Sequence, residues 1–357
     1  MLTVKIIKII VSIILILALG AYGFYYWITI PPTRVATPIV TGIHYVGLTV
    51  NDLESSSKFY SDVVDLRSVK KEVISNDSVI NQIIGRDHVQ LQSHLMKSVN
   101  AQLRFMQFDN PSNTASKAEF VDANGPGIAH VCYQVNEETH AYEKFLAGGG
   151  SPIGDINMIQ LSTKNPVKYA YARDLDNTMV EIEHVNIAAL NLPTPPQNNY
   201  RIRHVSLATT DMNRSIAFYS TLLETKNPRR AGRLVKLKGD KVDAVAGFDK
   251  TVIEMAWFQI RNLELEIVQY YSPAPKAAAP RPIDATGYNM IVFNVTDLSL
   301  AKDKLLAAGG TIVVENKSFD DAKILFGRDV DGNLLGFQIL DEKSPFSAKN
   351  FKDNGRG

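Results

Sequence analysis

Four stretches of the chain are rich in β-branched and aromatic residues and alternate in polarity, a pattern that predicts β-strands. They lie at residues 42–48, 127–135, 201–207 and 287–293. In each case helical and further β-rich segments follow, so the order strand, helix, strands occurs four times. The sequence therefore predicts an α+β protein of four β-α-β-β-β units, at residues 42–115, 125–186, 200–272 and 283–341.

The four units form an internal repeat of two halves, offset by about 160 residues. Asp52 and Asp211 each follow the opening strand of a half and are suited to cap a helix that carries Phe-Tyr. Helix ends with glycines recur at 145–150 and 305–310, and turn signals recur at 173–177 and 328–333. We therefore expect two domains, at residues 42–186 and 200–341.

The segments outside these domains have their own composition. Residues 32–41 are expected to be a tether, and residues 187–199, with Pro193, Pro195 and Pro196, a linker between the domains. Residues 342–357 are polar and glycine-bearing, which predicts a mobile tail.

The N-terminal segment, residues 1–31, contains an almost continuous apolar run from Ile9 to Ile30. Its length suits a membrane-spanning helix, and Lys5 and Lys8 place the N-terminus on the cytoplasmic side. We expect a retained anchor, with the globular part outside the cytoplasm. The alternative is a signal peptide cleaved after the Ala18-Leu19-Gly20 stretch, which would give a secreted protein.

Composition narrows the function classes. The chain has 357 residues, 45% hydrophobic and 21% charged, which is enough to build a large core. A net charge of +1 and the absence of a phosphate-tracking stripe of Lys and Arg argue against a nucleic-acid partner. Cys132 is the only cysteine, so the chain cannot form an internal disulfide.

Taken together, the repeat and its motifs resemble the vicinal oxygen chelate superfamily, which includes glyoxalase I, bleomycin-resistance proteins and extradiol dioxygenases. The resemblance covers about residues 42–340 and is carried by three features: histidines on opening strands (His44, His204), the Phe-Tyr helices, and the turns beginning at Asp174 and Asp329. It implies units in two pairs, each pair forming an open, U-shaped mixed sheet with helices outside. It also implies a divalent metal on the inner face.

The resemblance places metal ligands on the opening and last strands of each unit. In the first half these positions give His44, His130 and Glu181 as the metal ligands, with Arg104 where a glutamate would otherwise stand. Two imidazoles and one carboxylate with open positions suit Fe(II), with Mn, Zn, Ni or Co as alternatives. Three filled places look closer to extradiol dioxygenases than to glyoxalase I, which fills all four.

The corresponding positions of the second half give His204 and Glu266, but also Met290 and Gly336. Two ligands without the other two make a poor metal site. The second half is therefore interpreted as structural or as a metal-free pocket.

Two further residues of the first half are candidates for substrate contacts. Tyr171 lies ten residues before Glu181, a spacing that the resemblance associates with a catalytic, substrate-binding tyrosine. Arg104 could bind a substrate carboxylate or pair with a nearby acid. However, residues near Ala115 include no histidine, so ring cleavage lacks the acid–base partner that dioxygenases usually carry there.

The resulting expectation is a metal-dependent enzyme that binds a small organic substrate through two neighbouring oxygens. Ring-opening oxygenation and isomerase or lyase chemistry of the glyoxalase type are both compatible with it. The alternatives are a metal-free protein that sequesters a small molecule, as bleomycin-resistance proteins do, and a structural role at the cell envelope. A homo-oligomer is compatible with all three.

Overall fold

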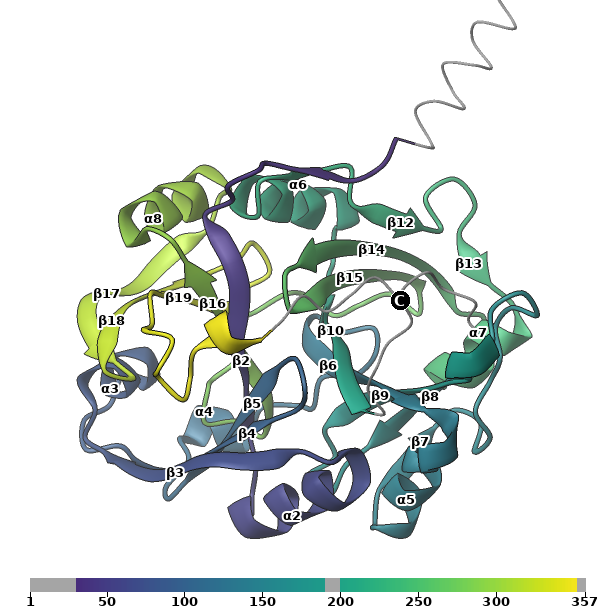
Figure 1. Cartoon of the computed structure of the whole chain (residues 1–357), viewed down its shortest axis with the longest axis horizontal. Coiled ribbons are helices and arrows are strands. Elements are labelled where there is room, and N and C mark those ends of the chain that lie inside the picture. Colours follow the sequence, from purple (N-terminus) through teal and green to yellow (C-terminus); the bar gives the residue numbers. More distant parts are fainter. Residues whose placement is uncertain (1–29, 190–199, 352–357) are drawn as a thin grey trace, which may run out of the picture.

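The computed structural model describes residues 30–189 and 200–351, which form two large curled β-sheets with helices on the outside (Figure 1). The strands of the eight-stranded sheet are β2 (Val40–Thr49), β3 (Arg67–Ser75), β4 (Gln90–Lys97), β5 (Gln102–Phe108), β16 (Gly287–Val295), β17 (Thr311–Phe319), β18 (Ala322–Arg328) and β19 (Leu334–Gln338). Those of the nine-stranded sheet are β6 (Gly127–Asn136), β7 (Ser151–Ile153), β8 (Val167–Arg173), β9 (Met179–Val185), β10 (Tyr200–Ala208), β12 (Arg229–Ala231), β13 (Leu237–Lys238), β14 (Val252–Ile260) and β15 (Leu263–Ser272).

Each sheet takes strands from both halves of the chain. In the eight-stranded sheet, β2 of the first unit lies antiparallel to β16 of the fourth unit. In the nine-stranded sheet, β6 of the second unit lies antiparallel to β10 of the third. The expectation that the two units of one half share a sheet is therefore wrong. The four units do form two pairs, but the pairs are first with fourth and second with third.

Within each unit, the opening strand also lies parallel to the last strand of the same unit. These parallel pairs are β2 with β5, β6 with β9, β10 with β15, and β16 with β19. The middle of each sheet is therefore made of two opening strands flanked by two last strands. Because side chains alternate between the faces of a strand, four strands from two units can direct residues to one concave face.

Most helices pack on the outer faces, and α2 and α6 connect units of the same half. The described α-helices are α2 (Leu53–Val64), α3 (Ser78–Ile84), α4 (Asn113–Ser116), α5 (Ala141–Ala147), α6 (Met212–Leu222), α7 (Asp240–Ala246) and α8 (Leu298–Ala307). Tyr60 of α2 donates a hydrogen bond to Asp174 of the second unit at 2.7 Å. Tyr219 of α6 donates one to Asp329 of the fourth unit, also at 2.7 Å. Helix contacts within each half and sheets shared between halves thus join all four units.

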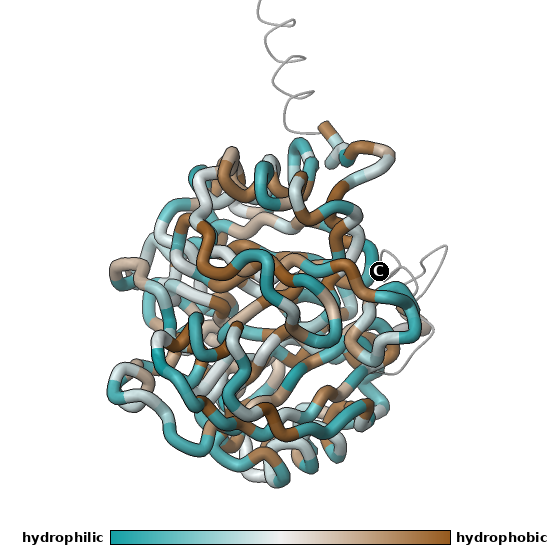
Figure 2. Tube along the Cα trace, turned by 90° about the vertical axis from the view of Figure 1, so that its left-hand side faces the viewer, coloured by the Kyte–Doolittle hydropathy of each residue, from teal (hydrophilic) through white to brown (hydrophobic). Residues whose placement is uncertain are grey.

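The largest apolar cluster includes residues of both sheets and of the helices, such as Leu48, Phe145, Phe218 and Phe293, all buried. Hydrophobic and hydrophilic residues alternate along much of the trace in Figure 2. This is the pattern of strands that bury one face under a helix and place polar side chains on the other face. The concave faces are therefore where polar chemistry can be located.

The terminal segments differ in part from the expectation. Thr33–Arg34 forms a short strand, β1, which pairs with β11 (Thr225–Lys226). The expected anchor lies almost entirely outside the described residues, as do residues 190–199 of the linker. Within the described ranges, no helix has the length and apolar character needed to cross a membrane.

The expected mobile tail is partly ordered. Phe346 and Ala348 are buried, and the guanidinium of Arg261 donates hydrogen bonds to the carbonyls of Ala348 and Phe351. Residues up to 351 of the segment expected to be a mobile tail therefore pack against the rest of the protein. Polar composition did not reveal that Phe346 of this segment packs in an apolar cluster of the eight-stranded sheet.

Candidate metal centre

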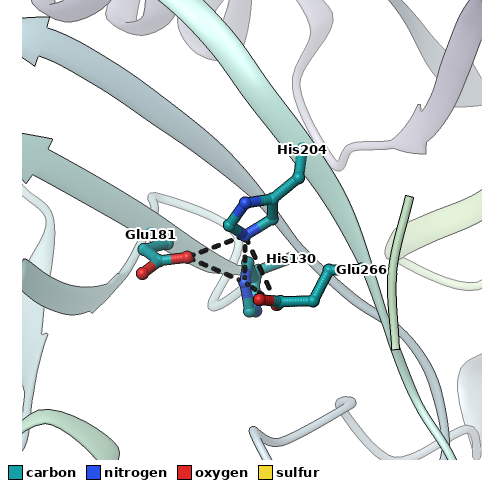
Figure 3. Close-up of side chains that lie close together, drawn as sticks. All are labelled: His130, Glu181, His204 and Glu266. Atoms are coloured by element: carbon teal, nitrogen blue, oxygen red, sulfur yellow. Dashed lines mark hydrogen bonds and ion pairs between the residues drawn. The ribbon is translucent and has the colours of Figure 1, made fainter. Parts of the chain in front are cut away.

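Four side chains converge on the concave face of the nine-stranded sheet (Figure 3): His130 of β6, Glu181 of β9, His204 of β10 and Glu266 of β15. The two Nε2 atoms lie 3.2 Å apart. Oε2 of Glu181 lies 3.1 Å from Nε2 of His130 and 2.9 Å from Nε2 of His204. Oε2 of Glu266 lies 3.5 and 3.4 Å from the same two nitrogens. Ligand atoms from four strands thus lie within 4.8 Å of one another.

The register of the sheet explains the convergence. Ser206 of β10 lies directly between His130 of β6 and Glu266 of β15. Cys132 of β6 lies directly between His204 and Glu181. The second and third units therefore contribute matching rows, each with a histidine and a glutamate that flank a small residue. A local two-fold relation exchanges His130 with His204, Glu266 with Glu181, and Ser206 with Cys132.

The chemistry of this group fits a divalent cation. All four side chains are buried, and together they bring two carboxylates into one water-poor space. Apart from the two imidazoles, Oε2 of Glu181 and both carboxylate oxygens of Glu266 have no hydrogen-bond partner, although buried carboxylates normally have several. Two imidazole nitrogens and two carboxylate oxygens are a donor set for borderline divalent ions such as Fe, Ni, Co, Zn or Mn. The residues therefore fit the metal that the resemblance implies.

The electrostatics of the group point the same way. Burial lowers the pKa of His130, but hydrogen bonds and charge from Glu181 and Glu266 outweigh it and raise this pKa to about 9. Burial raises the pKa of Glu181, but the two imidazoles outweigh that effect and hold it below its usual value. Without a metal, a proton on His130 provides part of the positive charge that the two carboxylates require.

Tyrosine, tryptophan and apolar side chains surround the group. The ring of Tyr171 lies 5.1 Å from that of His130, and Tyr171 stands opposite Glu181 on the neighbouring strand. Trp257 stands opposite Glu266 in the related position, and its indole N–H has no hydrogen-bond partner. An apolar cluster that includes Tyr171 also takes in Val245 and Ala246 of α7. One end of the concave face is thereby closed to water.

The sequence-predicted ligands are only partly brought together. His130 and Glu181 lie in one group, but His44 lies in the eight-stranded sheet. There its Nδ1 accepts a hydrogen bond from the backbone N–H of Ala348 at 2.9 Å, and its Nε2 lies 3.3 Å from the carbonyl of Gln338. Burial lowers the pKa of His44 to about 4, so the ring is neutral at pH 7. The triad of His44, His130 and Glu181 is not formed.

A one-residue difference explains the misplacement of His44. His204 lies seven residues before the capping aspartate Asp211, whereas His44 lies eight residues before Asp52. The residue seven positions before Asp52 is Tyr45. Since neighbouring residues of a strand point to opposite faces, the slip of one position directs Tyr45 to the concave face in place of His44.

The two residues predicted to contact the substrate, Tyr171 and Arg104, lie in different sheets. Tyr171 lies beside the metal-ligand group, as described above. Arg104 lies in the eight-stranded sheet, where its guanidinium pairs with Asp320 and Glu72, both at 2.8 Å. Of the two roles considered for Arg104, the structure shows pairing with acids.

His204 and Glu266 are the residues that sequence reasoning undervalued. Their types and strand positions were visible, but the two were assigned to a separate, incomplete site in the second half. Combining the second unit with the third, in place of the first, gives His, Glu, His and Glu with no gap. Completeness of the ligand set was the signal that could have selected the correct pairing.

The fold and the site define a class: an α+β protein of paired β-α-β-β-β units with a two-histidine, two-glutamate candidate metal centre. A family profile described as the Glyoxalase/Bleomycin resistance protein/Dioxygenase superfamily matches residues 42–182 and 201–337. The chain belongs to this superfamily.

Solved structures share the fold at low sequence identity. Glyoxalase I from Zea mays has a TM-score of 0.57 and 17% identity, and the match covers 84% of this chain and 92% of that one. A putative dioxygenase from Bacillus subtilis has a TM-score of 0.52 and 12% identity, covering 84% of this chain and 85% of that one. A search of curated proteins finds no match. These likenesses establish the fold and leave the reaction to be inferred from the site.

Proposed function

We propose that the chain is a divalent-metal-dependent enzyme that acts on a small organic substrate with two neighbouring oxygens. The observation that carries this proposal is the convergence of His130, Glu181, His204 and Glu266, with carboxylate oxygens that have no partner other than the imidazoles. A purely structural group would be expected to satisfy these buried atoms from within the protein. Instead they face one another around a common point, as ligands do.

The residues of this chain would divide the work. The two histidines and two glutamates would hold the ion, which would supply Lewis-acid stabilisation of an enolate-like or catecholate-like oxygen. Tyr171, beside His130, would form one wall of the substrate site and orient the substrate. The apolar cluster behind Tyr171 would exclude water, which strengthens every charge interaction at the site.

The four-ligand set changes which chemistry is favoured. The dioxygenase interpretation rested on three ligands, with a gap at Arg104. With Glu266 in that place, the donor set resembles that of glyoxalase I, in which all four places are filled. We therefore favour non-oxidative isomerase or lyase chemistry over ring-opening oxygenation, and we no longer single out Fe(II) among the divalent ions.

We also propose that the protein is held at the membrane by residues 9–30, with the globular part on the extracytoplasmic side. Support comes from the length and apolar character of this segment and from Lys5 and Lys8 before it. Carbonate extraction of membranes and N-terminal sequencing test this. A soluble mature chain that begins at Ala21 would contradict it.

Metal analysis of the full chain tests the proposed function. The protein would be purified in detergent without oxygen, reconstituted separately with Fe, Mn, Ni, Co or Zn, and desalted. We expect about one equivalent of at least one ion per chain, and less than about one-tenth of an equivalent for all five would contradict the proposal. The latter result would favour metal-free sequestration. Oxygen uptake with a panel of catechols then separates oxygenation from non-oxidative chemistry.

A further inference from the structure

A basic segment with no acidic residue lies at the edge of the nine-stranded sheet. Residues 226–238 contain six cations: Lys226, Arg229, Arg230, Arg233, Lys236 and Lys238. The chain as a whole has a net charge of only +1, so this segment is much more basic than the rest of the chain. Clusters of Lys and Arg beside exposed apolar residues are typical of surfaces that contact anionic lipid headgroups, on either side of a membrane.

The middle of this segment is a loop that stands out from the sheet. Strands β12 and β13 both pair with the edge strand β14, and residues 232–236, here called the edge loop, connect them. The loop leaves the sheet at Gly232, whose φ of +80° favours glycine and whose position has no room for a Cβ beside the carbonyl of Ile253. The turn therefore depends on a residue without a side chain.

Two apolar side chains occupy the tip of the edge loop. Leu234 is 53% exposed and Val235 is 78% exposed, and Val235 is the most exposed large hydrophobic residue of the described chain. Neither helps to build the core. Exposed apolar residues between cations are the composition expected where a protein dips into a lipid headgroup layer.

The local acids do not balance the cations. Arg230 and Lys236 both pair with Glu254, and Arg229 pairs with Glu264 at 3.2 Å. Glu264 also pairs with Arg203 of β10 at 3.4 Å, so these two carboxylates face four cations, an excess of two positive charges. An anionic surface would complement this excess.

The path of the chain indicates which partner this surface faces. Thr33 of β1 pairs with Lys226 of β11, so the chain enters the described structure directly beside the basic segment. Figure 1 shows β12 and β13 on the side where the purple N-terminal segment leaves the body. The residues before this point include the apolar run Ile9–Ile30. Two residues, Pro31 and Pro32, therefore separate this run from β1, so a bilayer that holds it would lie close to the edge loop.

We propose that the basic segment and the edge loop rest on an anionic membrane surface, with Leu234 and Val235 in the headgroup layer. The inference rests on the proposed membrane location and is independent of the metal chemistry. A nucleic acid would match the cations but would leave Leu234 and Val235 in water. The surface would fix the orientation of the globular part relative to the bilayer.

Fluorescence quenching in vesicles tests this contact on the full chain. Val235→Cys would be labelled with an environment-sensitive fluorophore and reconstituted into phosphatidylcholine vesicles with or without phosphatidylserine. The matched control is Val73→Cys, which is 64% exposed on β3, far from β12 in Figure 1. Native chain treated with the same fluorophore controls for labelling at Cys132, which is buried. We expect nitroxide lipids to quench the label at 235 by roughly half in the anionic vesicles, and to leave the label at 73 almost unchanged.

Charge reversal supplies the second readout. In the Val235→Cys background, Arg233→Glu with Lys236→Glu should remove most of the quenching, and Lys71→Glu on β3 should not. Equal quenching at 235 and 73, no quenching at 235, or a failure of the chain to associate with vesicles would each overturn the proposal. Quenching that is equally strong without phosphatidylserine would overturn its electrostatic part. Metal content measured on the same samples separates any of these failures from a failure of the proposed function.

Discussion

The concave faces of the two sheets have the same architecture and opposite contents. In the nine-stranded sheet, the four central positions are His130, Glu181, His204 and Glu266. The register assigns Met290, Gly336, Tyr45 and Arg104 to the same positions of the eight-stranded sheet: Met290 faces Gly47 as His130 faces Ser206, and Arg104 faces Gly47 as Glu266 faces Ser206. One face has all four ligands, and the other has none.

The second face is filled by a buried cation. Arg104 is 1% exposed, and its guanidinium donates to Asp320, to Glu72, to Ser93 and to the hydroxyl of Tyr45. It also lies 4.7 to 5.3 Å from the ring centroids of Tyr45, Phe319 and Phe346. Where the metal-ligand face has atoms without partners, this face satisfies its central charge from the protein itself.

A tight turn and a glycine also help to fill the concave face of the eight-stranded sheet. Asp320 and Asp321 form the tight turn between β17 and β18, both with positive φ, and the turn delivers the Asp320 carboxylate to Arg104. The missing side chain of Gly336 leaves space that the ring of Phe326 takes, since a Cβ there would lie 2.8 Å from it. The comparison teaches that one fold can carry an open set of ligands and a closed structural network at equivalent positions.

The largest expected effect comes from opening the structural network. Arg104→Met leaves the carboxylates of Asp320 and Glu72 without their buried partner, which should destabilise the fold by about 3–5 kcal/mol. The free energy of unfolding in urea, followed by circular dichroism, measures this. Adding Asp320→Asn should recover part of the loss. No loss of stability in Arg104→Met would contradict the structural role of this face.

Removing one carboxylate from the concave face of the nine-stranded sheet should weaken metal binding and leave the fold intact. We expect Glu181→Gln to weaken metal binding by about 100-fold or more, because an amide is a much poorer ligand than a carboxylate. Competition with a chromophoric chelator measures the affinity. The matched control is Glu72→Gln, the carboxylate beside Arg104, which should keep the metal. Unfolding of Glu181→Gln would instead indicate a structural carboxylate.

Metal affinity should depend on pH through His130. The pKa of this ring is raised to about 9 in the metal-free group, so the ring is protonated at pH 7 and must lose its proton to bind an ion. The affinity should therefore fall about tenfold for each unit that the pH drops from 9 towards 7. Chelator competition at several pH values tests this. A flat profile over this range would mean that His130 is already neutral.

The smallest effects are expected at two equivalent helix contacts, one within each half of the chain. Tyr60→Phe and Tyr219→Phe each remove a buried hydrogen bond to an aspartate, at a cost of about 1–2 kcal/mol. Both hydrogen bonds are 2.7 Å long, but Asp329 also accepts one from Asn333 at 2.8 Å, so Tyr60→Phe should cost somewhat more than Tyr219→Phe. Metal content should not change in either variant. A loss in only one half would show that the halves differ here as well.

Much of the fold could be predicted from the sequence, because local patterns determine it. The order of strand and helix in each unit follows from polarity, capping aspartates and glycine ends such as Gly149 and Gly309. The partner of each opening strand could not be predicted in this way. The alternation of polarity shows that one face of β6 packs against apolar neighbours, but it does not distinguish β2 from β10 as its neighbour.

Only half of the candidate metal centre could be predicted, for the same reason. His130 and Glu181 belong to one unit, and the superfamily's ligand positions on its opening and last strands place them together. His44 failed because its distance from Asp52 differs by one residue from that of His204 to Asp211. His204 and Glu266 were assigned to another site because sequence order suggested that each half was self-contained. Contacts between distant segments decide the outcome, and sequence periodicity does not report them.

The most direct test of the account compares the metal content of two histidine variants of the full chain. His204→Ala removes a ligand, and His44→Ala removes a ring that bonds only backbone groups of the other sheet. With folding verified by circular dichroism, we expect His44→Ala to retain about one equivalent of metal and His204→Ala to lose most of it. Retention in His204→Ala with loss in His44→Ala would contradict a metal centre shared between the two halves of the chain.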